Sequence, residues 1–142
     1  MNNVSALLER KNRPIVSVPS NTSVVDALKL MAEKNIGCVV VLEDKQYLGI
    51  FTERDYSRKV ILKGKDSATT IVSEIMSTEL ATATPGDSIE YCMETMTSKN
   101  IRYMPVFDNN ELKGIVSMSD VVKETILAQK ETINQLQNYI QS

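Results

Sequence analysis

Apolar and polar positions along the chain follow the same order twice, 65 residues apart. The triplet Lys-Asn-Ile at residues 34–36 recurs at 99–101, and Gly-Ile at 49–50 recurs at 114–115, without gaps. Self-similarity at a fixed spacing indicates that one structural unit is repeated. The pattern therefore predicts a tandem duplication.

Each copy predicts the same succession of strand, helix, strand, strand and helix. A short apolar run, 15–18 or 80–83, precedes a segment whose apolar residues recur at helical spacing. Two runs rich in β-branched residues follow, joined by the hairpin-length loops EDKQ and DNNE. Because a helix connects the first two strands, they should be parallel with a right-handed crossover. The apolar helix faces comprise Val24, Ala27, Leu28 and Met31 in the first copy and Ile89, Cys92, Met93 and Met96 in the second.

The fold and its boundaries follow from these elements. Neither copy has enough apolar faces to close a core alone, so we expect an α/β (α+β) fold of two βαββα repeats packed about a pseudo-twofold axis. Asp87 and Glu90 have the spacing of a capping box at a helix start. The predicted parts are an N-terminal segment (1–13), the first repeat (14–64), a polar linker (65–75), the second repeat (76–128) and a C-terminal helical extension (129–142).

A helical pattern continues from Asp120 nearly to the C-terminus. It carries an apolar stripe at heptad spacing, with one polar break at Gln129. The stripe could pack on its own domain or against a second subunit. We favour the subunit contact, and hence a homodimer, because residues past Gln129 extend beyond the repeat. The stripe consists of Val122, Ile126, Gln129, Ile133, Leu136 and Ile140.

Composition excludes several classes of function. Sixteen basic and eighteen acidic residues give a net charge of −2, which is not the footprint of a nucleic-acid binder. Histidine is absent, which excludes His-dependent triads and the usual zinc sites, and we expect neither catalysis nor a metal. Cys38 and Cys92 lie in apolar runs and are expected as reduced thiols. We find no signal peptide or membrane span in the pattern, so we expect a cytoplasmic protein without a membrane partner.

Both copies keep a glycine in a strand, a hydroxyl where that strand ends, and an aspartate three residues later. These pairs are Thr52 with Asp55 and Ser117 with Asp120. The hydroxyl and the carboxylate could simply cap a helix. A carboxylate at a helix start can also accept hydrogen bonds from the vicinal hydroxyls of a ribose, while the hydroxyl and backbone N–H groups face a phosphate or the sugar. The strand glycine would permit close approach of a flat ring.

This twofold pattern, Gly, apolar, any, Thr or Ser, two variable, Asp, strongly resembles the cystathionine-β-synthase (CBS) domain family. The resemblance covers about residues 14–128 and is to a stand-alone tandem pair of the small bacterial type. It implies a regulatory module that binds adenosine-containing ligands in clefts between the two repeats. Ligands of the family include AMP, ADP, ATP, S-adenosylmethionine and, in small members, NAD or NADH. No catalytic cofactor is implied, since the nucleotide is a regulatory ligand.

The resemblance also implies roles for individual residues. Asp55 and Asp120 would bind ribose hydroxyls, with Thr52 and Ser117 beside them. The phosphates would meet Arg54, Arg58 and Lys59 in the first copy, and Arg102 and Lys123 in the second. The copies differ at several of these positions, so we expect unequal sites. The adenine pockets would comprise Val16, Ser17, Val18, Ile36, Gly37 and Cys38, and Ala81, Thr82, Ala83, Tyr103, Met104 and Pro105.

Two other functions remain open. A ligand-free oligomerisation module would use the same fold without a nucleotide. A small nucleotide-hydrolysing enzyme would have only Cys38, Cys92 or the two aspartates as reactive groups, with no adjacent base to activate a thiol. The pattern does not select among adenine ligands, and a regulated protein partner would have to bind in trans.

Overall fold

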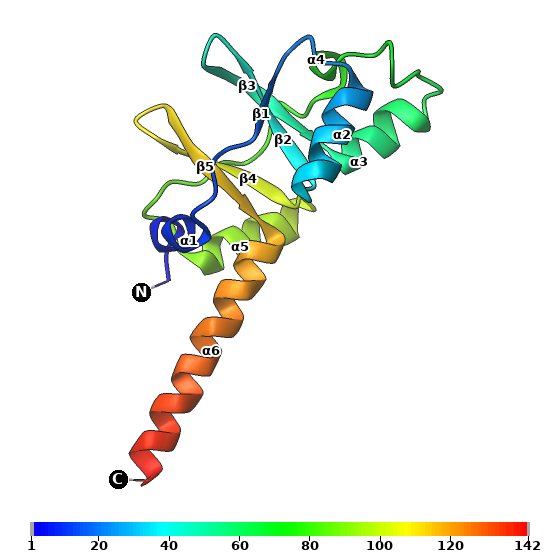
Figure 1. The fold of residues 1–142 in the computed structure, drawn as a ribbon. Coiled ribbons are helices and arrows are strands. Elements are labelled where there is room, and N and C mark those ends of the chain that lie inside the picture. Colours follow the sequence, from blue (N-terminus) through cyan, green and yellow to red (C-terminus); the bar gives the residue numbers. More distant parts are fainter. Residues whose placement is uncertain (1, 142) are drawn as a thin grey trace. The chain divides into compact units, whose positions relative to one another are not determined.

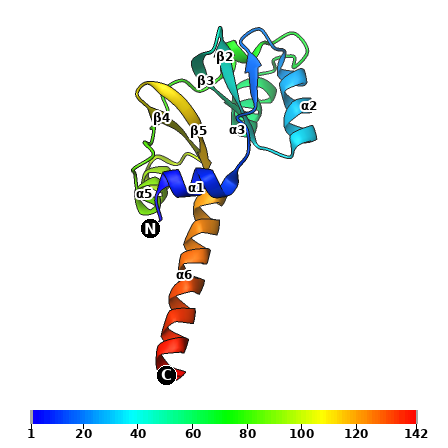
Figure 2. The same cartoon turned by 60° about the vertical axis from the view of Figure 1, so that its left-hand side comes forward.

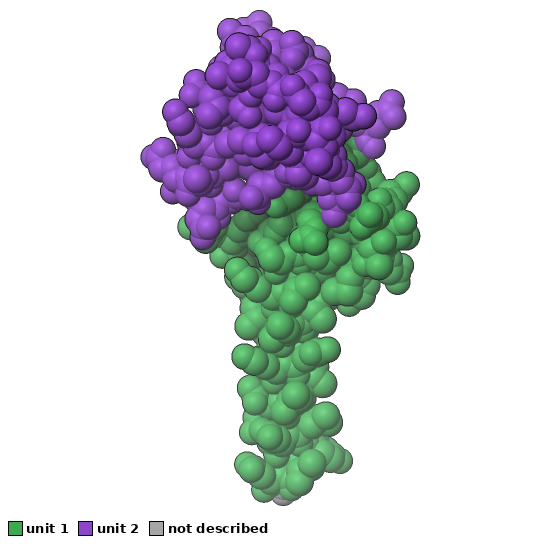
Figure 3. All heavy atoms as spheres, turned by 90° about the vertical axis from the view of Figure 1, so that its right-hand side faces the viewer, with its two compact units in different colours: residues 1–14, 80–142 green, residues 15–79 purple. Residues whose placement is uncertain are grey.

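The computed structural model describes residues 2–141, and the chain divides into two compact units (Figures 1 and 3). Unit 2 is residues 15–79 and contains the first repeat. Unit 1 combines the N-terminal residues up to 14 with the chain from residue 80 onward, and it contains the second repeat. The tandem duplication predicted from the sequence is thus confirmed as an α/β fold of two repeats with a long C-terminal helix.

Unit 2 is built on a three-stranded sheet in the order β1-β2-β3. β1 (Ser17–Pro19) runs parallel to β2 (Cys38–Glu43), and α2 (Val24–Lys34) connects them. β2 pairs antiparallel with β3 (Gln46–Thr52). This is the predicted order, and β3 leads directly into α3 (Glu53–Asp55) and the π-helix η1 (Tyr56–Ile61).

Both hairpins turn through two residues in the left-handed region. Asp44 and Lys45 have φ of 49° and 66°, and Asn109 and Asn110 have φ of 52° and 63°. Positive φ at both central positions matches the twist of the flanking strands, and Asn and Asp tolerate that conformation. The loops therefore form the hairpins that the sequence predicted.

Unit 1 repeats the arrangement with a smaller sheet of two strands. α5 (Ile89–Lys99) precedes β4 (Tyr103–Asp108), which pairs antiparallel with β5 (Glu111–Ser117). The prediction of a strand over 80–83 is wrong, because within this segment only Ala83 forms a bridge, parallel to β4.

Proline explains the missing strand. In unit 2 the N–H of Val40 donates to the carbonyl oxygen of Val16 at 3.0 Å and extends the β1–β2 ladder. The equivalent position in unit 1 is Pro105, which has no N–H to donate to Ala81. The ladder is therefore confined to the contacts of Ala83.

A short helix is exchanged between the repeats. α1 (Val4–Lys11) precedes the first repeat in the chain but belongs to unit 1, and α4 (Val72–Ile75) precedes the second repeat but belongs to unit 2. The N–H of the first residue of α1 donates to the carbonyl oxygen of Asp87, and that of α4 donates to the carbonyl oxygen of Thr22, both at 2.9 Å. The two helices are thus docked in equivalent ways.

These helices help to close one apolar core in each unit. Val4 and Leu7 of α1 and Val72 and Ile75 of α4 are buried, so segments expected as an N-terminal extension and a linker contribute to the cores. The expectation that neither repeat could close a core omitted these helices. The core of unit 1 also contains Ala83, Ile89, Cys92, Met96, Met104, Val106, Val116 and Val121, and that of unit 2 also contains Val18, Val24, Ala27, Met31, Val39, Val41, Phe51 and Val60.

The repeated Lys-Asn-Ile triplets end the helices α2 and α5. Asn35 and Asn100 are the C-caps, with φ of 55° and 53°, the left-handed conformation that asparagine tolerates. At the helix starts, Ser23 and Ser88 accept hydrogen bonds from backbone N–H groups three residues later. The capping box expected at Asp87 is wrong, because its carboxylate instead accepts from the N–H of Thr84 in the preceding turn.

The C-terminal helix α6 (Met118–Gln141) contains 24 residues. Figures 1 and 2 show its C-terminal half extending away from the rest of unit 1. The apolar stripe is exposed, from 43% at Val122 to 79% at Ile140. In the described chain the stripe therefore does not pack on its own domain. Despite its length, α6 is not apolar enough to cross a membrane, and neither is any other helix in residues 2–141.

Candidate functional site

The sheet register brings the predicted site residues of unit 2 together. Thr52, the last residue of β3, pairs with Cys38 at the start of β2, and the N–H of Glu53 donates to the carbonyl oxygen of Gly37 at 3.1 Å. Val16 directly precedes β1, and β1 is parallel to β2, so Val16 lies at this same end of the sheet. The segments assigned to ribose and adenine therefore meet at one sheet end.

Unit 1 has the same geometry. Ser117 pairs with Tyr103, and the N–H of Met118 donates to the carbonyl oxygen of Arg102 at 2.9 Å. The bridge at Ala83 brings the 81–83 segment alongside β4. Each copy thus assembles its own predicted residues locally.

A reciprocal pair of hydrogen bonds caps the helix in each copy. In unit 2 the N–H of Asp55 donates to Thr52 Oγ1 at 3.0 Å, and the N–H of Thr52 donates to Asp55 Oδ2 at 3.0 Å. In unit 1 the N–H of Asp120 donates to Ser117 Oγ at 3.1 Å, and the N–H of Ser117 donates to Asp120 Oδ2 at 2.9 Å. The helix-capping interpretation of both pairs is therefore correct, and a ligand role must coexist with it.

Asp55 is also held by two side chains. Its Oδ1 accepts from Ser77 Oγ at 2.8 Å and lies 2.9 Å from the ammonium of Lys59. Lys59 also donates to the carbonyl oxygen of Ile75 at 3.1 Å. The Asp55 side chain is only 6% exposed, so the carboxylate is a buried charge that is paired and hydrogen-bonded.

Asp120 receives its cation from α1. The ammonium of Lys11 lies 2.8 Å from Asp120 Oδ2 and donates to the carbonyl oxygen of Ile115 at 3.0 Å. The Asp120 side chain is 15% exposed. Each aspartate therefore has a lysine that also binds a backbone carbonyl, although the two lysines come from different elements.

A charge reversal between the copies explains the different lysines. The residue four positions after the aspartate is Lys59 in unit 2 but Glu124 in unit 1. Glu124 is buried, and Arg10 of α1 binds it with two hydrogen bonds of 2.8 and 3.1 Å. α1 thus supplies two cations, Lys11 and Arg10, where the second copy has two acids.

The environment of Asp120 lowers its pKa. Burial raises the pKa of this carboxyl, but the Lys11 hydrogen bond, the backbone N–H of Ser117 and the positive charge of Lys11 together outweigh burial and hold the pKa below its usual 3.8. Because the folded-state pKa is depressed, the stabilisation is complete above the unfolded-state pKa and is lost as the pH falls through the folded-state pKa.

Lys11→Met should therefore destabilise the protein in a pH-dependent way. A hydrogen bond to a charged group contributes about 1.5–3 kcal/mol, so we expect a loss of this size at pH 7. The loss should shrink as the pH falls below about 3.8, because Asp120 becomes protonated in both proteins. Urea unfolding at pH 7 and at the lowest pH where the wild type stays folded measures both.

Lys113→Met is the matched control for this experiment. Lys113 pairs with Glu111 at 3.3 Å on the surface of the same unit, with side chains 40% and 73% exposed. Such pairs contribute little, so this variant should change stability slightly at either pH. An equal loss for Lys11→Met at both pH values would contradict the assigned role of the Lys11–Asp120 pair.

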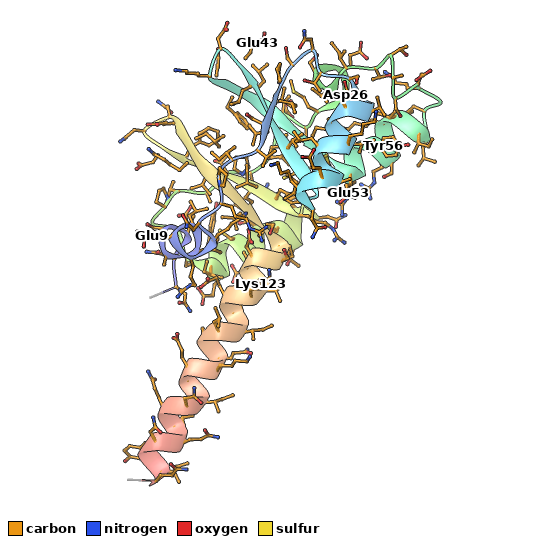
Figure 4. All side chains as sticks on the ribbon, in the orientation of Figure 1. Glu9, Asp26, Glu43, Glu53, Tyr56 and Lys123 are labelled. Atoms are coloured by element: carbon orange, nitrogen blue, oxygen red, sulfur yellow. The ribbon has the colours of Figure 1, made fainter. Side chains whose placement is uncertain are left out.

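The other predicted cations lie on the surface or near it. Arg58, Arg102 and Lys123 are exposed, and Arg54 is partly buried. Figure 4 labels Lys123 near the start of α6 and Glu53 and Tyr56 near the start of α3 and η1. Lys11 and Ser77 were not predicted from the sequence, because they lie 109 and 22 residues from their aspartates. The available signal was a pair of apolar residues three positions apart in each of α1 and α4, which could have indicated that both helices pack on a core.

The predicted adenine residues divide by burial. Val18, Ala83, Met104 and Pro105 are buried, whereas Ser17 and Thr82 are exposed on the other face of their segments. A ligand at these segments would therefore meet the backbone and the exposed or partly buried residues. The partly buried ones are Val16, Ile36, Gly37, Cys38, Ala81 and Tyr103.

The strand glycines serve internal packing. A Cβ on Gly49 would lie 2.7 Å from the backbone oxygen of Ser77, and one on Gly114 would lie 2.9 Å from Leu8 Cδ2. The space beside each glycine is thus filled by the segment of α4 or by α1. The expectation that these glycines admit a flat ring is wrong, since a protein segment makes the close approach.

Neither a metal-binding cluster nor a disulfide is found in residues 2–141. Burial, with a smaller contribution from Asp87, raises the pKa of the Cys92 thiol to about 11. Cys92 is therefore protonated at neutral pH and is a core residue.

Comparisons with known proteins match this arrangement. A family model described as "CBS domain" matches residues 4–61 and 72–126. Each match begins at the first residue of an exchanged helix, α1 or α4. The chain is 39% identical over 127 residues to the mitochondrial CBS domain-containing protein CBSX3 of Arabidopsis thaliana, covering 86% of this chain and 62% of that protein. It is 33% identical over 118 residues to the CBS domain-containing protein YhcV of Bacillus subtilis, covering 83% and 84%.

Solved structures agree in fold. A putative signal-transduction protein with CBS domains from Burkholderia ambifaria has a TM-score of 0.85 and 40% identity, covering 90% of this chain and 96% of that one. A CBS-domain containing protein from Agrobacterium tumefaciens has a TM-score of 0.81 and 37% identity, covering 86% and 98%. The chain spans less than two thirds of the Arabidopsis relative but nearly all of these solved chains.

Proposed function

The chain belongs to the CBS-domain family, and on that premise we propose that it is a regulatory module that binds an adenosine-containing nucleotide. The ligand classes are AMP, ADP, ATP or NAD(H), bound at the turns that carry Asp55 and Asp120. The similarity to a protein described as signal-transducing supports a role in which the ligand state is passed to another protein.

One observation carries the proposal. In each unit one aspartate lies within hydrogen-bond distance both of a strand-end hydroxyl residue and of a lysine ammonium. A ribose requires an acceptor for its hydroxyls, and the attached phosphate requires a cation. Histidine, the commonest general base, is absent from the sequence, which favours binding over catalysis.

We further propose how the ligand and the lysines exchange partners. Ribose hydroxyls would replace Lys59 on Asp55 and Lys11 on Asp120, and each ammonium would then turn to the phosphate. Arg54 and Arg58, or Arg102 and Lys123, would add to the cationic side. A ligand that carries both ribose and phosphate thereby leaves every charge paired.

The two sites should differ in affinity. Asp55 is more buried than Asp120, and its lysine comes from the same helical segment rather than from α1. Calorimetric titration with AMP, ATP and NAD is therefore expected to resolve two unequal sites for at least one nucleotide. At 100 times the dissociation constant the ligand should stabilise the fold by about 2.7 kcal/mol, seen as a rise in the unfolding temperature.

The alternatives make different predictions in the same experiments. A ligand-free oligomerisation module would show neither heat nor thermal shift with any of these nucleotides, and that result would end the proposal. Two sites of identical affinity would contradict only the prediction that the sites differ, and not the proposal that they bind a nucleotide. Turnover of bound ATP or NAD would instead support a small hydrolase. Mass spectrometry of small molecules that co-purify with the native protein identifies the ligand directly.

We also propose the setting of this module. A nucleotide sensor of this type would act in the cytoplasm, on a protein partner that binds in trans, as a homodimer. The name of the Arabidopsis relative places that protein in mitochondria. Solved relatives include a protein described as hexameric, so self-association is the expected state.

A further inference from the structure

The distal part of α6 extends away from the core of unit 1 (Figure 1). Every described residue from 129 onward is exposed. An isolated helix of this length is marginal in water, and this segment is rich in Gln, Asn and Thr rather than Ala. Its helical state is therefore explained if another surface covers the apolar stripe.

The stripe has the heptad pattern of a two-stranded coiled coil. Ile126, Ile133 and Ile140 occupy position a, and Val122, Gln129 and Leu136 occupy position d. Isoleucine at a with leucine at d favours two parallel strands, because β-branched side chains fit the a layers of that geometry. The occupant that this pattern fits is a second copy of the same helix.

The polar break selects the parallel orientation. In a parallel, in-register pair, Gln129 of one copy faces Gln129 of the other, and two side-chain amides can donate to and accept from each other. In an antiparallel pair each Gln129 would face an apolar a position and leave a buried amide unpaired.

Charge also favours a parallel pair. Positions e carry Lys123 and Lys130, and positions g carry Thr125 and Thr132. Parallel helices set g against e, which brings threonine to lysine. Antiparallel helices set e against e, which brings lysine to lysine. A membrane surface fits less well, because the exposed segment 129–141 carries one lysine and one glutamate, Lys130 and Glu131, and therefore no net positive charge.

We propose that α6 pairs with α6 of a second copy of this chain as a parallel, in-register coiled coil from Val122 to Ile140. The Gln129 layer sets the register. α6 begins directly after the strand that ends at Ser117, so the coiled coil starts within one turn of Asp120. The two copies are thereby joined at an element that also carries a proposed ligand residue.

Disulfide trapping tests the pairing. Ile140→Cys should form a linked dimer under mild oxidation, because two a positions of a parallel pair lie close enough for a disulfide. In an antiparallel pair that overlaps the same stripe, the two residues would lie roughly 27 Å apart. The wild type, whose Cys92 is buried and whose Cys38 is partly buried, gives the background level of linkage.

A matched pair of charges then separates the stripe from the rest of the helix. Ile133→Asp in the Ile140→Cys background puts a carboxylate in an a layer and should abolish linkage. Asn134→Asp puts the same carboxylate on the adjacent, off-stripe position and should leave linkage unchanged. Both sites are exposed, so circular dichroism should show intact globular units in both variants.

Sedimentation at micromolar concentration completes the test. We expect a dimer for the wild type and a dissociation constant raised about a hundred-fold or more by Ile133→Asp. A monomeric wild type, or a partner protein covering α6 in place of a second copy, would overturn the proposal. So would a dimer that Ile140→Cys fails to link, because its contact would lie elsewhere.

Discussion

Asp55→Asn is expected to lower nucleotide affinity at its own site by about ten- to a hundred-fold and to lower the free energy of unfolding by about 1–3 kcal/mol. Asparagine keeps the size of the side chain but has only one oxygen acceptor. The carboxylate serves the N–H of Thr52 through Oδ2, and Ser77 and Lys59 through Oδ1. Since the side chain is 6% exposed, water cannot replace the lost acceptor. Calorimetric titration and urea unfolding measure the two losses.

Two matched variants separate ligand binding from folding. Asp120→Asn should weaken the other site and leave the Asp55 site nearly unchanged. Asp26→Asn removes an exposed first-turn acid of α2 (Figure 4), which should cost only a few tenths of a kcal/mol and leave binding intact. If Asp55→Asn and Asp120→Asn both lose stability while titrating normally with nucleotide, the aspartates are structural only, and the proposed function fails with them.

Gly49→Ala should destabilise the protein much more than the same change at Gly114. The new methyl group would lie 2.7 Å from the backbone oxygen of Ser77, which must move. Ser77 exchanges two backbone hydrogen bonds with Ile50, at 2.8 and 3.0 Å, and its hydroxyl binds Asp55. Overpacking of this kind costs about 1–3 kcal/mol, and the displaced Ser77 should also weaken the Asp55 site.

Gly114→Ala is the built-in control. Its methyl group meets the end of the Leu8 side chain at 2.9 Å, and that side chain can rotate away without moving the backbone. We expect a loss below about 1 kcal/mol. Chemical denaturation of both variants decides the matter: equal losses would show that the contact with the Ser77 backbone is not what makes Gly49 sensitive.

Local pattern was enough to predict most elements of this protein. The two hairpins depend on neighbouring Asp and Asn residues that tolerate positive φ, and the helix ends depend on Ser and Asn caps within the same turn. The hydrogen bond from the aspartate N–H to the hydroxyl three residues earlier is also local. Such features are recovered from sequence because the interacting groups are separated by only a few residues.

The strand over 80–83 shows where local pattern fails. An apolar run predicts a strand, but a strand also needs a neighbour that can donate hydrogen bonds. That neighbour contains Pro105. The prediction required the register between two segments more than twenty residues apart, and the period of apolar residues does not contain it.

Local pattern along the chain established the repeat, the order of the elements and the identity of the two aspartates. Tertiary structure alone decided that Lys11 neutralises Asp120. Lys59 lies four residues from Asp55, whereas Lys11 lies 109 residues from Asp120 and reaches it because α1 is exchanged into unit 1. An ion pair depends on distance in space, and only the packing of α1 against β5 and α6 brings these two charges to 2.8 Å.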